Sequence, residues 1–339
     1  MIGGRPRTYN RSVGFQIGRQ GLAGLLFALL LAATNGARAS ADSQTIATTA
    51  GPIIFGQLQY GSITVHTWDR PEVEIDAEPT VDVRHIEHVP QSLPFQPFFI
   101  AQTVQSPEGE LRLPAEPFLV PQLDTSPHDA VGFHGFGNVT ITIPAGSPLV
   151  IARVGEGEVT IDGYHGGTFF ALVRAGLLHL NDVGGTGGFQ VNNGPAIVQN
   201  SNFDRIRART GRGNMFFENT TSRQIDATSL TGSIVYDNGS FEPGLARFET
   251  QRGNIALGVA RGGAQIDAHS GSGKVLSEGS FPSGPVVTAT SGTGNVMYYN
   301  GSIRSHPALQ RQLPIRPMHG VPRRRRGPPR RAPGREPLQ

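Results

Sequence analysis

The sequence predicts an all-β protein built around a single-stranded β-solenoid of about eight coils, with β-strands before it and a disordered basic tail after it. A glycine followed by two apolar residues at alternate positions recurs eight times between Val150 and Tyr299. These glycines, called the pivots below, lie 18 to 21 residues apart, and a fixed period of this length is typical of stacked repeats. The pivots are Gly157, Gly176, Gly194, Gly213, Gly232, Gly253, Gly273 and Gly294.

Each repeat in the predicted solenoid domain, residues 132–303, contains two runs of alternating apolar and polar residues, which is the pattern of a β-strand. Val159 and Ile161 follow the first pivot, and Ile206 and Ala208 precede Gly213. One repeat is too small to bury its own apolar side, so stacked repeats would share a core made of columns. Glycine suits the corner between the two runs because it adopts positive φ without steric cost. An antiparallel sandwich of short strands is the alternative fold, and the regular pivot spacing favours the solenoid.

Two repeats depart from the pattern. Around Gly194 the apolar run before the pivot contains Phe189, and around Gly253 the leading strand, taken as Phe248 and Thr250, lies two residues closer to the pivot. We interpret both repeats as intact coils with shorter corners.

Residues 1–39 are predicted to be a secretory signal peptide. A leader with four arginines precedes the apolar stretch Gly21–Thr34, and Ala37-Arg38-Ala39 matches a small-x-small cleavage site. The apolar stretch is shorter than the roughly 20 residues needed to cross a bilayer, although an uncleaved anchor stays an alternative. The chain has no cysteine, so disulfides and thiolate metal sites are excluded. We therefore expect a bacterial protein exported to the periplasm or the cell surface.

Residues 40–88 are predicted to be an N-terminal β segment that forms the first part of the β domain. Gly61-Ser-Ile-Thr-Val65 repeats the pivot pattern, Trp68-Asp-Arg-Pro71 indicates a turn, and an alternating strand follows it. Together with Asn138–Gly146 and the glycine-paced strands after it, this pattern resembles the bacterial putative adhesin-like β-strand-repeat family of unknown function. That family is similar in pattern to the bactofilins. The resemblance covers about Gly56 to Tyr299, interrupted by an insert, and implies an exported β-solenoid without established catalytic residues.

The insert, residues 89–131, is rich in proline, glutamine and phenylalanine. Proline removes hydrogen-bond donors from a sheet, so a central strand is not expected here, and the phenylalanines argue against full disorder. We expect the insert to lie over one side of the solenoid.

A column three residues after the pivots should point outward, yet it is largely apolar, which is typical of an interface. We expect this column, called the stripe below, to be covered by the insert or by another molecule, unless the inward and outward faces of this strand are reversed. The candidate interface residues are Ile197, Phe216, Val235, Leu276 and Met297.

The charges are divided between the body and the tail. Residues 304–339 contain ten Arg and one Glu, a net charge of +9, whereas residues 40–303 contain 14 basic and 25 acidic residues, a net charge of −11. The composition predicts a disordered tail. For an exported protein the expected counterpart is an anionic envelope surface, another envelope protein or the acidic body itself, and not nucleic acid; a solvated tail without a partner is the alternative. The candidate tether residues are Arg323, Arg324, Arg325, Arg326, Arg330 and Arg331.

No catalytic, cofactor or metal site is predicted. His85, His88 and the pair His128 and Asp129 suggest metal ligands, but strand residues three apart face opposite sides and no further ligand has a defined spacing. A polysaccharide-cleaving β-helix would need acids clustered on one outer face. Most aspartates are scattered; Asp226 and Asp267 share one outward column with Arg207 and Thr288, which indicates a solvated row or at best a glycan-binding face.

These observations favour a non-catalytic, adhesin-like or scaffolding protein of the bacterial cell envelope, expected to be a monomer. Two alternatives stay open: an enzyme or binding module acting on envelope polysaccharide, and a self-assembling bactofilin-like structural protein, because the ends of a solenoid are open sheet edges.

Overall fold

The computed structural model describes residues 43–48, 51–89, 98–106, 109–117, 128–165, 167–262, 265–278, 287–291 and 296–299. By its internal contacts the chain divides into Met1–Ser302 and Ile303–Gln339, and every described residue belongs to the first unit. The described residues form strands and turns, without a helix. The predicted signal peptide, the pivot Gly294 and the basic tail lie outside the described residues.

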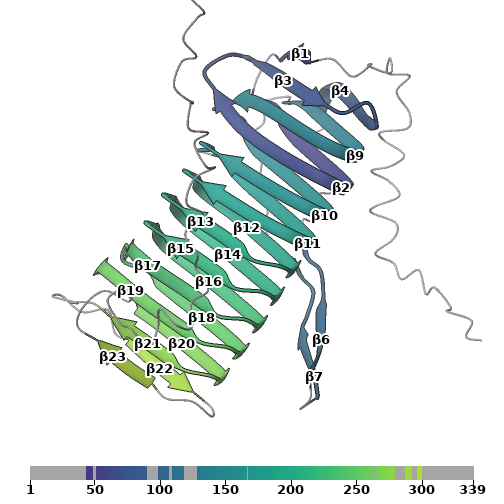
Figure 1. Ribbon diagram of the computed structural model, residues 1–339. Helices are drawn as coiled ribbons and strands as arrows, with labels where there is room; N and C mark the ends of the chain where they lie inside the picture. The colour runs from purple at the N-terminus through teal and green to yellow at the C-terminus, as the bar shows by residue number, and fades with distance from the viewer. Residues whose placement is uncertain are drawn as a thin grey trace, which may run out of the picture. The chain divides into compact units, whose positions relative to one another are not determined.

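The fold is a β-solenoid of about six turns, in which strands stack in parallel and in register (Figure 1). The segments that flank Gly213 and Gly232 pair in parallel with their counterparts one layer away, which confirms a solenoid and excludes the antiparallel sandwich. The stacked strands are β2 (Ile53–Trp68), β9 (His128–Pro144), β10 (Leu149–Asp162), β11 (Thr168–Asn181), β12 (Gly184–Asn193), β13 (Ala196–Gln199), β14 (Asn202–Arg212), β15 (Met215–Glu218), β16 (Thr221–Thr231), β17 (Ile234–Phe241), β18 (Leu245–Arg252), β19 (Ile255–Gly262), β20 (Gln265–Ser272), β21 (Val275–Glu278), β22 (Val287–Ser291) and β23 (Val296–Tyr299).

The N-terminal segment is itself a layer of the stack. β2 lies between β9 and β10 and is parallel to both, so Gly61 pairs with Gly137 on one side and with Gly157 on the other. β9 begins at His128, within the range predicted as the insert, and the stack therefore starts before residue 132.

The N-terminal edge of the stack is covered by antiparallel strands (Figure 1). Residues 74–77 of β3 pair with residues 139–142 of β9, and residues 81–89 of β4 pair with residues 128–135. β1 pairs with β3 in turn. Because β9 is paired on both sides, it offers no open edge for end-to-end pairing with another chain. The strands of this cap are β1 (Gln44–Ala47), β3 (Glu72–Ala77) and β4 (Val81–Val89).

The pivots form one corner of the solenoid. From Gly157 to Gly273 they have φ between 139° and 154°, a conformation that side chains rarely adopt. A Cβ on any of these glycines would overlap the carbonyl oxygen of the pivot in the layer before it; for Gly213 that oxygen belongs to Gly194. The corner therefore requires glycine both for its backbone angle and for the close approach of the layers.

Inside this corner the core consists of columns, and the two irregular repeats keep their place in them. Ala246 pairs with Ile225, and Phe248 pairs with Ala227. The prediction that this leading strand lies closer to its pivot was wrong, because Phe248 occupies the alanine column and Thr250 the next one. In the neighbouring layer the large residue, Ile225, comes before the small one, Ala227, whereas in this layer the small residue, Ala246, comes before the large one, Phe248. Each layer therefore still contributes one large and one small residue to the core.

A similar exchange of volume occurs between neighbouring layers. Gly187 pairs with Phe169 in a column of mostly large residues, and a Cβ on Gly187 would overlap the Phe169 ring. Phe189 in turn pairs with Ala171 and Ala208 in the small column. An aromatic ring therefore fills the space above a small residue, which preserves the close packing of the interior.

A second corner carries a ladder of side-chain amides spaced 19 residues apart. Asn181 Nδ2 donates to Asp162 Oδ1 at 2.7 Å, Asn200 Nδ2 donates to Asn181 Oδ1 at 2.9 Å, and Asn219 Nδ2 donates to Asn200 Oδ1 at 3.2 Å. Asn238 continues the ladder by donating to Asn219. Asn200, Asn219 and Asn238 have φ of 51° or 52°, which asparagine tolerates better than most residues.

We predict that Gly213→Ala lowers the free energy of unfolding by more than about 2 kcal/mol, because it adds backbone strain and a clash with a main-chain oxygen. Gly146→Ala is the matched control, since Gly146 is exposed with open space around its Cβ position, and its effect should stay within about 0.5 kcal/mol. Urea unfolding measures both variants. Equal effects would contradict the corner argument.

We also predict that Asn219→Ala costs about 1–2 kcal/mol and Asn219→Gly clearly less, because glycine keeps the positive φ and loses only the ladder hydrogen bonds. Asn193→Ala, at an exposed position of β12 without positive φ, should be neutral. If Asn219→Gly costs as much as Asn219→Ala in thermal unfolding, the amide ladder and not the backbone angle is what requires asparagine.

Candidate functional site

The stripe points away from the core, as the sequence predicts. Met215 and Phe217 on either side of Phe216 are fully buried in the core, whereas Phe216 itself is half-buried. Ile197 is also half-buried, and Val235 is only 4% exposed although it lies outside the central core cluster. Leu276 is similarly buried, and the side chain of Met297 lies outside the described residues.

The predicted column of charges is continuous. Arg207, Asp226, Arg247 and Asp267 follow one another in register, and Arg207 Nε lies 3.5 Å from Asp226 Oδ2. Thr288 is next in register. The signs alternate along the column, and the ion pair shown within it is that of Arg207 with Asp226. Arg247 pairs instead with Glu249 on its own strand, at 3.1 Å. A partly exposed ion pair of this kind contributes little to stability.

The histidines considered as metal ligands are partly brought together. His85 on β4 lies 4.0 Å from the buried carboxylate of Asp129 on β9. The side chain of His88 lies outside the described residues, and within the described ranges no three His, Asp or Glu side chains are grouped so as to hold a metal ion.

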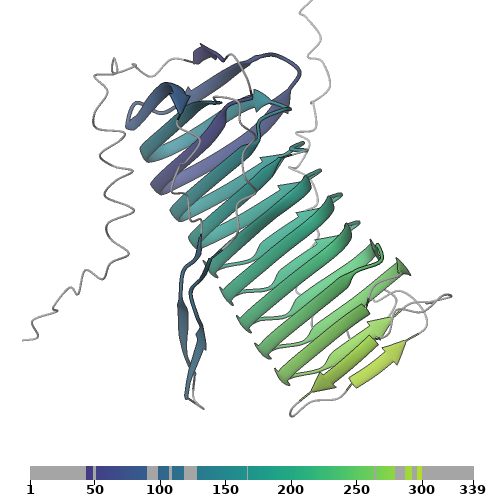
Figure 2. The same cartoon turned by 180° about the vertical axis from the view of Figure 1, so that it is seen from behind.

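Residues 98–106 and 109–117, which lie within the insert, are called the arm below. It consists of the two-residue pairing of β5 (Phe98–Phe99) with β8 (Glu116–Pro117) and a hairpin of β6 (Gln102–Ser106) and β7 (Gly109–Leu113). The hairpin lies beside the stack, mainly against β14 and β16 (Figures 1 and 2). Hydrogen bonds also join it to Asn192 on β12 and to Gln251 on β18. The arm thus lies over one side of the solenoid, but on the strands that precede the pivots, whereas the stripe follows them.

Phe99 is the apolar anchor of the arm. Its ring is 4% exposed and belongs to a cluster on the outer face of the strands, separate from the core. The guanidinium of Arg209 lies 4.8 Å from the ring centroid and that of Arg207 lies 6.0 Å from it, a geometry that adds cation–π attraction. The other buried members of this cluster are Ile53, Phe55, Leu149, Ile151 and Phe170.

Polar contacts fix the position of the arm along the stack. Gln102 Nε2 donates to Asn192 Oδ1 at 2.7 Å, and Arg209 Nη1 donates to the carbonyl oxygen of Pro114 at 2.9 Å. Farther out, Val104 and Leu113 pack against Leu230 on β16. Because the buried polar groups are satisfied only when donor and acceptor meet, they select one docking position.

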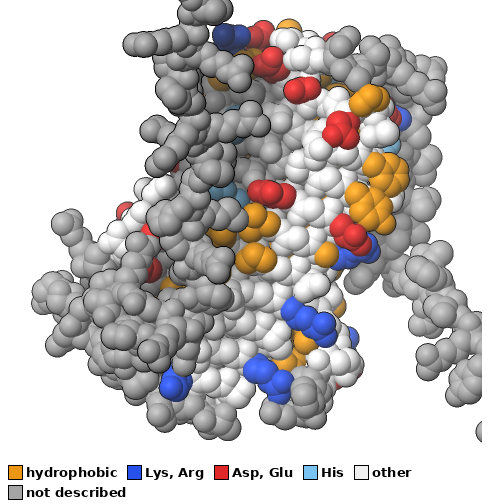
Figure 3. Space-filling view, in the orientation of Figure 1, with side chains coloured by type: hydrophobic (Ala, Val, Ile, Leu, Met, Phe, Trp, Pro, Cys, Tyr) orange, Lys and Arg blue, Asp and Glu red, His pale blue; other side chains and the backbone are white. Residues whose placement is uncertain are grey.

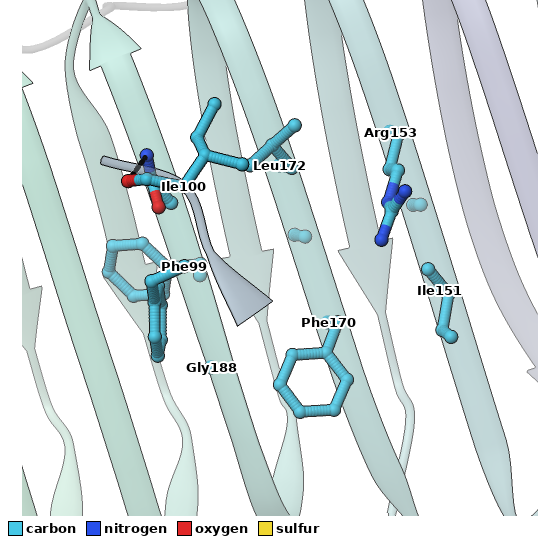
Figure 4. A pocket seen from close by; sticks show the side chains of 11 residues that line it. Phe99, Ile100, Ile151, Arg153, Phe170, Leu172 and Gly188 are labelled. Carbon is cyan, nitrogen blue, oxygen red and sulfur yellow. Dashed lines mark hydrogen bonds between the residues drawn. The ribbon is translucent and has the colours of Figure 1, made fainter. Parts of the chain in front are cut away.

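A small pocket of about 90 Å³ opens where the base of the arm meets β10, β11 and β12 (Figure 4). Figure 4 shows Arg153, Ile151, Phe170 and Leu172 projecting from the strands toward the side on which Phe99 and Ile100 lie. Burial lowers the pKa of Arg153 from its usual value, but a guanidinium stays charged at neutral pH. The remaining lining residues are Ala152, Ala171, Gly188, Phe189 and Gln190.

The charges on the face seen in Figure 3 are unevenly spread. Asp and Glu side chains gather over the upper, N-terminal layers, and Lys and Arg side chains lie over the lower ones. The column just before the pivots follows the same order, with Glu156 on β10, Arg212 on β14 and Arg252 on β18. This face of the body therefore has a charge polarity of its own.

The chain matches no protein-family model, no curated protein and no solved structure. The resemblance to the adhesin-like repeat family therefore stays a prediction from the residues. No helix that could span a bilayer occurs in the part of the chain that the structure describes.

Sequence reasoning missed the junction between the arm and the stack, although a signal for it exists. Strict alternation fails in Ile53-Ile54-Phe55, in Leu149-Val150-Ile151 and in Phe169-Phe170, which are continuous apolar runs. Such runs are typical of strands that are buried on both faces. Here the inner face meets the core and the outer face meets Phe99.

We predict that Phe99→Ala releases the arm while the solenoid stays folded, because the ring holds the arm to a surface cluster and not to the core. Amide hydrogen exchange of residues 102–113 should speed up at least tenfold, and exchange in β14 and β16 should hardly change. Phe136→Ala is the control, since the Phe136 side chain is 46% exposed on β9. Unchanged exchange in the hairpin would show that Phe99 does not anchor it.

Proposed function

We propose that this protein is an exported, non-catalytic scaffold of the bacterial cell envelope, adhesin-like in presenting a long face of stacked strands. The observation that carries the proposal is the parallel stacking of the strands from β9 to β23, which repeats side-chain positions at a spacing of about 4.8 Å apart from local register shifts such as the one at Gly185. In such a stack every layer is hydrogen-bonded to the next, which supports a rigid presenting surface. The eight-coil count, including the coil around Gly294, is part of this proposal.

The cap on β9 supports a monomer over a filament. Head-to-tail growth of a solenoid needs an open edge at each end, and here β3 and β4 occupy the edge at one end. A bactofilin-like polymer would have to displace these antiparallel strands before a second chain could pair with β9.

The tail would hold the scaffold to an anionic surface. Residues 320–339 contain seven Arg and one Glu, and a basic side chain near an anionic membrane contributes about 1 kcal/mol of attraction at physiological salt. The body carries a net charge of −11 over residues 40–303, so it would be repelled by the surface that attracts the tail. This arrangement favours a rod that stands away from the surface to which it is tethered.

The competing function is an enzyme or binding module acting on envelope polysaccharide. Asp226 and Asp267 are separated by one layer in their column, and Asp226 is paired with Arg207. The pairing supports a surface role for these acids. Turnover of peptidoglycan or acidic polysaccharide that is lost in Asp226→Asn or Asp267→Asn would favour the enzyme.

We predict that the protein produced in a bacterial host is exported, begins at Ser40 and fractionates with the envelope. Deleting residues 320–339 should leave export intact but release the protein to the soluble fraction, because the charges of the tail are lost. In vitro, binding to vesicles with anionic lipid should fall steeply with salt for the full chain and be absent after the deletion. Replacing residues 304–319, which carry three Arg, with a neutral linker is the control and should weaken binding much less.

An unprocessed protein in the cytoplasm would contradict export. Equal vesicle binding with and without residues 320–339 would contradict the tether and leave the export result standing on its own.

A further inference from the structure

Arg153 is a cation without a counter-ion in the described part of the chain. The contact that the structure gives its guanidinium is with the Phe55 ring, whose centroid lies 5.7 Å away. Its partners in register, Gln57 on β2 and Leu172 on β11, are neutral. Arg153 is only partly exposed to solvent, so an anionic group that enters the pocket could form a charge-assisted hydrogen bond with its guanidinium.

Gln190 provides an unpaired acceptor at the same pocket. Its side chain is 1% exposed, and its Nε2 donates both to the Ile100 carbonyl oxygen at 3.1 Å and to Asn192 Oδ1 at 2.8 Å. These two acceptors fix the amide orientation, because a flipped amide would place an oxygen against both of them. None of the described residues gives Gln190 Oε1 a hydrogen bond. A buried acceptor of this kind calls for a donor such as a hydroxyl group.

The two polar groups lie in one outward column with an apolar residue between them. Arg153, Leu172 and Gln190 are successive in register, so their Cα atoms span two layers, or about 10 Å. Ile151 and Phe170 border this line on the neighbouring column, and the arm covers it from the other side (Figure 4).

We propose that this pocket binds a small aliphatic carboxylate, with its carboxylate on Arg153 and its chain on Ile151, Phe170 and Leu172. The cavity of about 90 Å³ is smaller than the ~150 Å³ cavity that takes benzene, which limits the buried chain to roughly four to six carbons. A terminal hydroxyl would donate to Gln190 Oε1. The assignment does not depend on export or on the scaffold role.

Binding at this pocket would also hold the arm in place. Phe99 and Ile100 belong to the arm, whereas the other lining residues belong to the stack. A ligand that needs both walls binds only the docked state, so it shifts the arm toward docking by mass action.

The test uses the full-length protein and hexanoate as the probe, with binding followed by NMR or calorimetry. Hexanoate should bind at millimolar concentration, 6-hydroxyhexanoate more tightly, and hexanol at least tenfold more weakly. Arg153→Gln should weaken hexanoate binding at least tenfold. Arg174→Gln is the matched control, because Arg174 is an exposed arginine on the neighbouring strand paired with Glu156, and binding should not change.

Leu172→Trp supplies a second, steric variant. It keeps Arg153 and should close the pocket to hexanoate, while thermal unfolding shows that the solenoid is intact. Saturating hexanoate should also slow amide exchange of residues 102–113 in the wild type and not in Arg153→Gln. The proposal is overturned if hexanoate does not bind, if hexanol binds as well as hexanoate, or if folded Arg153→Gln or Leu172→Trp binds as the wild type does.

Discussion

The constraint on which the rest of the structure depends is the close approach of consecutive layers at the glycine corner. In a parallel, in-register stack each pivot lies over the preceding one, and its missing Cβ leaves room for that residue's carbonyl oxygen. A side chain at a single pivot would disturb its own backbone angle and the neighbouring layer together. This double requirement explains why the glycine recurs at Gly61 and at every described pivot from Gly157 to Gly273 while the lengths of the other segments vary.

Because the corner holds the layers in register, the core packs well as long as the side chains of each layer fill about the same total volume. Phe169 over Gly187, and Ala246 before Phe248, show that large and small residues exchange places as long as their sum is kept. Near the pivots the core also contains polar residues, whose hydroxyl groups need hydrogen-bond partners. Ser270 and Thr250 are fully buried, and their hydroxyls donate to the carbonyl oxygens of Gly253 and Gly232 at 2.8 Å and 3.0 Å. The carbonyl oxygens of the corner thus accept hydrogen bonds from these two hydroxyls, which replace apolar side chains in the later layers.

The arm makes one side of the repetitive solenoid chemically different from the rest. A regular solenoid face offers the same chemistry at every level, so a specific site requires an element that breaks the repeat. Phe99 and the buried polar contacts of the arm supply this element and produce a second apolar cluster outside the core. The pocket with Arg153 lies at that junction. Both proposed roles therefore use different parts of one structure: the uniform stack presents a surface, and the arm creates a place on it that binds a ligand.

The amino-acid sequence by itself determined the period, the corner glycines, the strand alternation and the parallel stacking, because these features are local and are repeated many times along the chain. The outward direction of the stripe at Phe216 also followed from alternation alone. Only the tertiary structure decided that β2 lies between β9 and β10, that the arm docks before the pivots, and that Arg153 and Gln190 border one pocket. These features depend on contacts that occur once, between segments about 90 residues apart or more, such as Gln102 with Asn192 and Gln251 with Arg112. A contact that occurs once produces no repeating pattern in the sequence. It can therefore be recognised only in the folded structure.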